Sequence, residues 1–576
     1  MDRRDFLTGG AAGGLVGLHS AAKATLSDRK IPTVERLSAV YPSQSAVVYV
    51  EGREEPGDGG EGLFVWSETQ NPDAYDRKST RAEGALYVRS DQSEEGNWFR
   101  VIEQPRMNVR WFGARGDGTG DDAAAINDAL WVSGASGVLH TYIPGGTYRL
   151  DRPVRIGDWG SGHLIEGDGI LTTRLVKKSD GTARMRGSGP DEVDACIAID
   201  RFDTGQRVVD FYGTEIRGMS LQGNSDDEKK GPFSRTYGIY VRGANRLQFS
   251  NMQFRYFNTA FFARTLWMSS LDHLKASQVR NFVVVGGTES MIREDQDAAE
   301  DDEDAYLQVP SSTSVHISNC FCTNDISGTA FLLNKLYYST ISNCGADYVD
   351  GWPYHVKRSR GITLESTGFE WSQAGRGVWF EGSTGTIIGL QGLNTRPNPD
   401  DSTQTSLLHI TEDSTGQASG VTVHNSYVGE FTDKQNRRIS PSDLNRAANS
   451  NIRLTGGSDL TLIQTRVSRN GGDDPGWEEG EGSQLVALGG NLSPSSLRLQ
   501  NAGGLIGDNA RATILDSDGV NVHDQSVVGE RQEAVKRLDQ TVDSSYDASQ
   551  IQAISDKVDA IIDVLSASSG HGLTDD

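Results

Sequence analysis

Carboxylate and aromatic side chains are concentrated between residues 345 and 381 of this 576-residue chain. Three of its ten tryptophans, Trp352, Trp371 and Trp379, lie in this stretch. Sugar rings stack on the faces of aromatic side chains, and carboxylates bind hydroxyl groups or exchange protons with a glycosidic oxygen. The combination therefore indicates a carbohydrate site, although each residue taken singly also fits a turn acid or a packed aromatic.

Two carboxylates on neighbouring coils of the chain could hydrolyse a glycosidic bond. Hydrolysis needs an acid and a second carboxylate, with carboxyl groups about 5 Å or about 6.5–9.5 Å apart depending on the stereochemical outcome. Neighbouring strands lie about 4.8 Å apart, so residues about 20 positions apart in a coiled chain can meet this demand. We predict Glu370 and Asp350 as the leading acid and base, with Asp347 as the alternative partner of Glu370.

Carbohydrate binding is expected from the aromatic and cationic side chains of the same stretch. We assign it to Trp352, Trp371, Trp379, Tyr354 and Arg358. A lyase would instead remove a proton next to a uronic carboxylate, which requires a base and a cation that neutralises this carboxylate. Candidates for these roles are His355, Lys357, Arg358 and Arg376. The sequence does not separate a hydrolase from a lyase.

Short segments of alternating apolar residues follow one another up to about residue 515 and predict a succession of β-strands. Four of them end in an asparagine that follows Ser or His: Asn251, Asn319, Asn343 and Asn425. The second and third are 24 residues apart, which fits a coil of roughly 20 to 25 residues. We predict that these asparagines form an internal ladder at turns. Cys320 and Cys344, which follow two of them, should then be stacked neighbours with free thiols.

A Gly- and Asp-rich motif precedes these strands. Residues 113–126 read G-A-R-G-D-G-T-G-D-D-A-A-A-I, and residues 142–148 read Y-I-P-G-G-T-Y. Ala123 to Val132 scans as a helix, and Asp121 or Asp122 can cap it by accepting from free backbone N–H groups. A stack of parallel strands leaves an open end with unpaired backbone groups, which such a helix can cover.

This motif resembles the opening of the pectate-lyase-like superfamily. That superfamily includes polysaccharide lyases, rhamnogalacturonase-like hydrolases, mannuronan epimerases and phage tail spikes. The resemblance covers about residues 109–150 and implies an all-β chain built as a right-handed parallel β-helix. The residue patterns outside this motif predict in addition a small N-terminal β head and C-terminal helices. It implies little about chemistry, because the opening motif is structural and does not carry the active site.

Four regions are expected along the chain. Arg3 and Arg4, followed by Phe-Leu and an apolar stretch, resemble a twin-arginine export signal over residues 1–24. Residues 25–108 read as a small β head, and residues 109–515 as the parallel β-helix. Residues 516–576 read as helical, and apolar positions from Ile551 to Leu565 step by three and four, which indicates a homotrimeric coiled coil.

The charge of the chain excludes some partners. The net charge of −24 opposes binding to nucleic acid or to an anionic membrane, and no apolar run reaches the length of a membrane span. The acidic stretch from Thr288 to Thr313 predicts a solvated loop. Carboxylates suit calcium, so calcium binding is left open here although no ligand spacing supports a site, and no other cofactor is expected.

The expected function is to bind and cleave an extracellular polysaccharide, with the protein secreted through the twin-arginine route. One alternative is a virion tail spike that recognises a host surface glycan. The separate β head and the C-terminal heptads favour this alternative, whereas the export signal favours a secreted enzyme. A non-catalytic adhesive β-helix is the third possibility.

Overall fold

The structure of the chain is a computed structural model. It describes residues 30–42, 46–76, 79–157, 161–178, 183–184, 192–200, 209–223, 236–287, 310–397, 405–429, 431–433, 449–467, 477–479, 484–488 and 511–515. None of the helices in these ranges combines the length and the apolar character that a membrane span needs.

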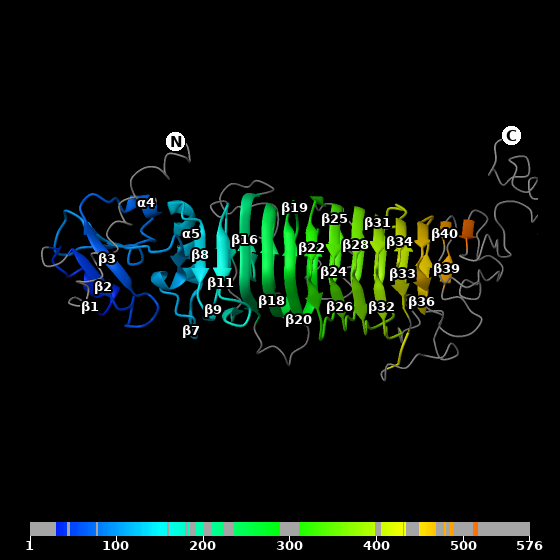
Figure 1. The fold of residues 1–576 in the computed structure, drawn as a ribbon, viewed down its shortest axis with the longest axis horizontal. Helices are drawn as coiled ribbons and strands as arrows, with labels where there is room; N and C mark the ends of the chain where they lie inside the picture. The colour runs from blue at the N-terminus through cyan, green and yellow to red at the C-terminus, as the bar shows by residue number, and fades with distance from the viewer. Residues whose placement is uncertain are drawn as a thin grey trace, which may run out of the picture.

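A five-stranded sheet forms the N-terminal part of the described chain and lies at one end of the elongated molecule (Figure 1). Its strand order is β1-β2-β3-β5-β4. The first pair of strands is parallel and the others are antiparallel. The elements are β1 (Lys30–Ile31), α3 (Val34–Leu37), β2 (Val47–Val50), β3 (Gly62–Ser67), α4 (Asp73–Asp76), β4 (Tyr87–Arg89) and β5 (Asn97–Arg100).

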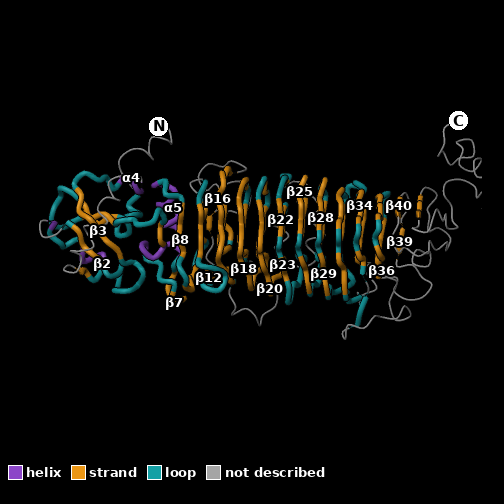
Figure 2. Tube along the Cα trace, viewed as in Figure 1, coloured by secondary structure: helices purple, strands orange, loops and turns teal. Residues whose placement is uncertain are grey.

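The rest of the described chain winds into a stack of parallel strands, as Figures 1 and 2 show. Each coil contributes to three sheets. Sheet 1 holds β8 (His140–Ile143), β11 (Leu164–Gly167), β22 (His316–Ser318), β25 (Leu336–Ser342), β28 (Arg360–Glu365), β31 (Thr384–Ile388), β34 (Gly420–His424), β37 (Asp459–Ile463), β40 (Gln484–Leu488) and β41 (Arg511–Leu515), with β6 (Met107–Asn108) paired to β8.

Sheet 2 holds β7 (Asp117–Asp121), β9 (Gly146–Leu150), β12 (Thr173–Lys177), β23 (Phe321–Cys322), β26 (Gly345–Asp347), β29 (Gly368–Glu370), β32 (Gln391–Leu393), β35 (Tyr427–Val428) and β38 (Arg466–Val467). Sheet 3 holds β10 (Val154–Ile156), β15 (Ala195–Ile199), β17 (Tyr237–Val241), β24 (Phe331–Asn334), β27 (Tyr354–Lys357), β30 (Val378–Glu381), β33 (Thr405–Thr411), β36 (Asn449–Leu454) and β39 (Trp477–Glu479).

Several strands belong to more than one sheet or to none of the three. Three long strands continue around corners: β16 (Val209–Gln222), β18 (Ala244–Ala263) and β20 (Ser270–Val285). Two short strands, β19 (Leu266–Trp267) and β21 (Ser312–Thr313), precede sheet 1, and β13 (Ala183–Arg184) pairs with β14 (Glu192–Val193). One apolar core runs through the stack. The prediction of an all-β parallel β-helix is confirmed.

The N-terminal end of the stack is covered by η3 (Val109–Phe112) and α5 (Ala123–Ser136). The buried side chains of Ile126 and Leu130 join α5 to the core. Asp121 Oδ1 accepts from the backbone N–H of Ala123 at 3.1 Å at the start of the helix. Asp122 instead accepts from the backbone N–H of Arg115 at 2.6 Å. Asp121 therefore caps the helix, and Asp122 fixes the loop before it.

The four asparagines of the repeated unit lie where sheet 1 turns into sheet 2. Each adopts a left-handed conformation, with φ between 47° and 54°, which asparagine tolerates better than most residues. Their placement at turns was predicted, but the internal ladder was wrong, because all four are exposed. Asn319 donates its side-chain amide to Asp272 at 2.8 Å on the outer surface.

Serines form the internal ladder instead, at the corner where sheet 3 turns into sheet 1. The backbone N–H of Ser359 donates to Ser383 Oγ, that of Ser383 to Ser419 Oγ, and that of Ser419 to Ser458 Oγ. These serines are buried, so each hydroxyl satisfies a donor that would otherwise be costly. The cysteines Cys320 and Cys344 are free and buried, as predicted.

Several sequence predictions fall outside the described residues. These are the export signal (residues 1–24), the C-terminal helices and their trimer seam (516–576), and residues 288–309 of the acidic stretch. At the end of that stretch Ser312 and Thr313 form β21, so the loop predicted up to Thr313 is wrong for its last two residues.

Candidate active site

The corner between sheets 2 and 3, called corner 2 below, brings two of the predicted carboxylates together. Asp347 ends β26 and Glu370 ends β29, and the two are direct register partners on neighbouring parallel strands. The backbone N–H of Glu370 donates to Asp347 Oδ1 at 3.2 Å. Both side chains are partly exposed. Strand spacing of about 4.8 Å is close to the separation of about 5 to 5.5 Å between the carboxyl groups of retaining glycosidases.

Asp347 of this pair has a raised pKa. Burial and the neighbouring Glu370 carboxylate raise the pKa of Asp347 to about 6, and the hydrogen bond from the Glu370 N–H offsets only part of this rise. A carboxyl group of this pKa holds its proton under mildly acidic conditions. Asp347 therefore has the property of a general acid.

Two aromatic rings lie immediately after this pair. The rings of Tyr348 and Trp371 stack with centroids 5.0 Å apart and planes 20° apart, and Tyr348 is 41% exposed. Both residues have left-handed backbones, with φ of 54° and 48°, as do Gln278 and Asn394 at the same corner. Corner 2 thus requires a conformation that costs a bulky residue about 1–2 kcal/mol, and in return it presents the aromatic pair to solvent.

The third predicted carboxylate, Asp350, does not face Glu370. It is exposed in the turn after β26, and its backbone N–H donates to the carbonyl of Ile326 at 2.8 Å. Burial and the Asp325 carboxylate raise the pKa of Asp350, while Arg376 opposes the rise. Arg376 Nη1 also donates to the Asp350 carbonyl at 3.3 Å. Asp350 is therefore a neighbour of the carboxylate pair and not a member of it.

Trp352 and Trp379 lie in an aromatic stack on the outer face of sheet 3. One face of Trp379 stacks on His355, with centroids 4.1 Å apart, and His409 stacks on Trp379 at 5.3 Å. These three residues are register neighbours on β27, β30 and β33, so the histidines cover both faces of the indole. Trp352 packs against Trp379 and is buried. The two histidines therefore occupy the ring faces that Trp379 was predicted to offer to a sugar.

Basic side chains on the outer face of sheet 3 contact a buried carboxylate. Glu381 accepts from His355 Nε2 at 2.8 Å and lies 3.1 Å from Lys357 Nζ. Burial alone would raise the pKa of Glu381, but the hydrogen bond and charge of His355 and the charge of Lys357 outweigh it and lower the pKa. Burial lowers the pKa of His409 to about 3, so this ring is neutral near pH 7.

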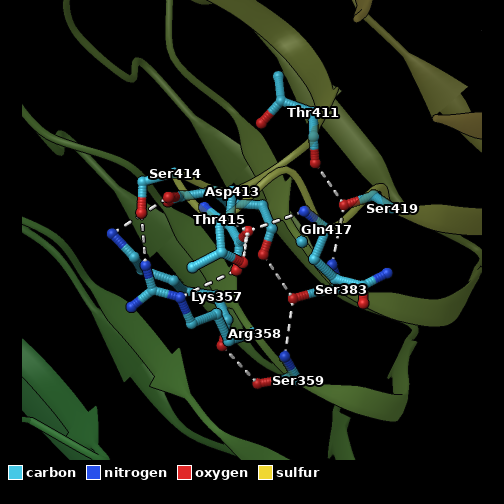
Figure 3. Close-up of polar contacts among 12 residues, drawn as sticks. Lys357, Arg358, Ser359, Ser383, Thr411, Asp413, Ser414, Thr415, Gln417 and Ser419 are labelled. Carbon is cyan, nitrogen blue, oxygen red and sulfur yellow. Dashed lines mark hydrogen bonds and ion pairs between the residues drawn. The ribbon is translucent and has the colours of Figure 1, made fainter. Parts of the chain in front are cut away.

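Tyr354 and Arg358 are placed for structure and not for ligand contact. Tyr354 is fully buried, and its hydroxyl donates to the carbonyls of Cys344 and Gly368 at 2.8 and 3.0 Å. Arg358 is buried and donates to Asp413 and Ser414 at 2.9 and 2.8 Å, as Figure 3 shows. Both residues were predicted to bind carbohydrate, but the structure leaves neither side chain accessible to it.

Truncation of Trp371, beside an exposed tyrosine, should have a different effect from truncation of Trp379, which lies between two histidines. We expect Trp371→Ala to weaken glycan binding with little loss of stability, because its partner Tyr348 is exposed. Trp379→Ala should lower the free energy of unfolding by about 2–3 kcal/mol, below the range for a fully buried tryptophan, and leave glycan affinity of the folded protein unchanged. Affinity electrophoresis and equilibrium unfolding in urea measure the two effects, and reversed outcomes would contradict this division of roles.

Tyr348 and Glu381 were missed by reasoning from the sequence. Tyr348 precedes Trp371 by 23 residues, which is the spacing of Asp347 and Glu370, so the coil period was a usable signal for the aromatic pair. No such signal pointed to the burial of Glu381. In the part of the chain that the structure describes, no group of three or more His, Cys, Asp or Glu side chains is arranged to hold a metal ion.

Known proteins resemble parts of this chain in sequence. The sequence model of the family described as "Rhamnogalacturonase A/epimerase, pectate lyase-like" matches residues 106–345. The mannuronan C5-epimerases AlgE4 and AlgE3 of Azotobacter vinelandii are 30% and 38% identical to this chain over 143 and 159 residues, or 24% and 27% of its length. These segments span 23% and 8% of the two epimerases. The family match ends before Asp347, so it does not extend to the carboxylate pair.

Solved structures resemble the fold over a longer range. A tailspike of an Acinetobacter phage, gp42, superposes with a TM-score of 0.59 and 17% identity, and the match covers 80% of this chain and 74% of the tailspike. At this identity the likeness concerns the fold alone. Together with the family match over residues 106–345, it supports a parallel β-helix of the pectate-lyase-like kind.

Proposed function

We propose that the chain acts on an extracellular polysaccharide and hydrolyses its glycosidic bonds at corner 2. The observation that carries this proposal is the pairing of Asp347 with Glu370 on adjacent strands, with the pKa of Asp347 raised to about 6 by burial and by Glu370. A carboxyl group that holds its proton, next to a second carboxyl group, is what acid-assisted glycoside hydrolysis requires. The exposed Tyr348 and stacked Trp371 adjoin the pair as a surface for a sugar ring.

Asp347 acts as the general acid in this proposal. It donates its proton to the glycosidic oxygen as the bond from this oxygen to the anomeric carbon breaks. Glu370 attacks the anomeric carbon and forms a glycosyl ester. Water then displaces Glu370 from that carbon, so the ester bond breaks as Asp347 takes the proton of the water. The close spacing of the two strands favours the attacking role, with retention of anomeric configuration.

Elimination is less well supported than hydrolysis at this position. A lyase needs a cation beside the substrate carboxylate, and the sequence offered Lys357, Arg358 and Arg376 for it. Lys357 lies against Glu381 and Arg358 against Asp413, in buried ion pairs. Arg376 lies over the Trp352 ring at 5.9 Å and binds the backbone of Asp350, so the cations of the window are engaged with the protein itself.

A virion tail spike that degrades or binds a surface glycan is the second candidate. The fold likeness to a phage tailspike over 80% of the chain favours it, while the partial identity to bacterial epimerases accords with a secreted enzyme. Both candidates, the secreted enzyme and the tail spike, have a polysaccharide partner and act outside the cell or on a virion. Assembly as a homotrimer through residues 516–576 remains a proposal, which rests on the heptad spacing between Ile551 and Leu565.

Release of reducing ends from a panel of polysaccharides tests the enzymatic proposal. We expect at least one glycan to be cleaved, with a shortening of the polymer on size-exclusion chromatography. Proton NMR of the early product should show the anomeric configuration of the substrate. Binding of a glycan without any release of reducing ends would support the adhesive alternative, which requires no acid.

A further inference from the structure

We infer that the sugar unit held between the carboxylate pair and the Tyr348–Trp371 rings is electrically neutral, and that polyuronates are poor ligands of this site. This inference rests on the proposed function and names its substrate class. It separates the chain from its epimerase relatives, whose names specify mannuronan.

Corner 2 carries four carboxylates within three successive coils. Asp347 and Glu370 are register partners, and Asp350 follows Asp347 in the same turn. Asp325 precedes Ile326, which bridges to Val349 on the next coil. The carboxylates act on one another, since Glu370 raises the pKa of Asp347 and Asp325 raises that of Asp350. A sugar ring above the pair is therefore exposed to a local negative potential.

Few cations offset this potential in the described residues. Arg376 is the cation that acts on Asp350, and Asp347 has no cation among the causes of its shifted pKa. Arg280 lies two coils before Asp350 on the same corner, or roughly 10 Å away by strand spacing, and Arg396 lies one coil after Glu370. Arg396 Nη1 donates to Thr432, one coil further from the pair.

A uronate ring placed here would bring a further negative charge beside the carboxylates that surround the proton-carrying Asp347. Like charges side by side at an interface oppose binding strongly. Elimination and epimerisation both begin with loss of the proton beside the uronate carboxylate, and this step needs that charge to be neutralised. A neutral ring avoids the repulsion, and its hydroxyl groups can donate hydrogen bonds to carboxylates.

Matched glycans test the inference. Alginate and polygalacturonate are compared with the same polymers after chemical reduction of their carboxyl groups, alongside neutral galactan, mannan and glucan. Binding to the Glu370→Gln chain is measured at low and high salt, and the wild-type chain is assayed for reducing ends, for unsaturated uronate by ultraviolet absorbance, and for C5 inversion by NMR.

We expect each polyuronate to bind at least about tenfold more weakly than its reduced form at low salt, with the difference narrowing at high salt as charges are screened. The double substitution Asp325→Asn and Asp350→Asn should also narrow this difference in binding.

Equal binding of a polyuronate and its reduced form overturns the inference and leaves a polysaccharide-acting site. The same holds if the wild-type chain forms an unsaturated or C5-inverted product and Glu370→Gln abolishes it. Preference for neutral glycans with cleavage unaffected by Glu370→Gln supports the inference and overturns the proposed hydrolytic pair. Absence of binding to every glycan overturns both.

Discussion

Cleavage by Asp347→Asn and by Glu370→Gln chains should be about 10²–10⁴-fold slower than by the wild-type chain, the usual contribution of a positioned acid or base. Each substitution keeps the size and hydrogen-bonding capacity of the side chain and removes its titrating proton or its negative charge. Glycan binding should survive, because the Tyr348–Trp371 rings are unchanged. Initial rates of reducing-end release at saturating substrate measure the effect.

The pH dependence of cleavage should identify Asp347 as the acid. Its pKa is raised from 3.8 to about 6, so the carboxyl group is protonated below this value and loses its proton above it. An acid must carry its proton to act, so the rate should fall as the pH rises through about 6. The Asp347→Asn chain should lack this decline in its residual activity, because its amide does not titrate.

A suitable control is Glu365→Gln. Glu365 ends β28 on the outer face of sheet 1 and is exposed, so it matches Glu370 in type and lies only five residues earlier in the chain, on a different sheet. We expect its activity to equal that of the wild type. Wild-type rates in Glu370→Gln and Asp347→Asn, on a glycan that the parent clearly degrades, would show that the active groove lies elsewhere.

The fold could be predicted because its signals are local and periodic. The opening motif and the 24-residue spacing of Asn319 and Asn343 follow from the stacking of coils, where every turn repeats the same backbone conformation. The direction of the asparagine side chains could not be read from this spacing. A left-handed residue at a corner can point outward, as Asn319 does, while a serine ladder at another corner satisfies the buried N–H groups.

The candidate site was predicted in part, because sequence spacing gives which residues are neighbours but not which face they occupy. Asp347 and Glu370 were found through the coil period. Asp350 was predicted to lie opposite Glu370 because the prediction assumed a coil of about 20 residues. At this position the coil is 23 residues long, so that Asp347 is the residue opposite Glu370. Trp379 was misread because the histidines that cover its faces lie 24 and 30 residues away.

Arg358 offers the sharpest contrast between the prediction from sequence and the structure. It was predicted to bind carbohydrate, but its guanidinium group lies 2.9 Å from Asp413 in a buried ion pair at the corner where sheet 3 turns into sheet 1. Burial alone would raise the pKa of Asp413, but hydrogen bonds from Thr415, Gln417 and Arg358 outweigh it and lower the pKa. These bonds hold the segment after β33 against the corner (Figure 3).

We therefore expect Arg358→Met to lower the free energy of unfolding by about 3–5 kcal/mol, the cost of leaving one charge of a buried pair without its partner. Glycan affinity of the folded protein should not change. Because the pKa of Asp413 is lower in the folded state than its unfolded value of 3.8, the stabilisation by the pair is complete above that value and is lost as the pH falls through the folded pKa.

Arg115→Met is the matched control, since Arg115 and Glu54 form an ion pair with both side chains more than half exposed, and such pairs contribute at most about 1 kcal/mol. Equilibrium unfolding in urea at neutral and acidic pH measures these differences. If Arg358→Met abolished glycan binding while unfolding like the wild type, Arg358 would be a ligand contact and the assignment of the site to corner 2 alone would be wrong.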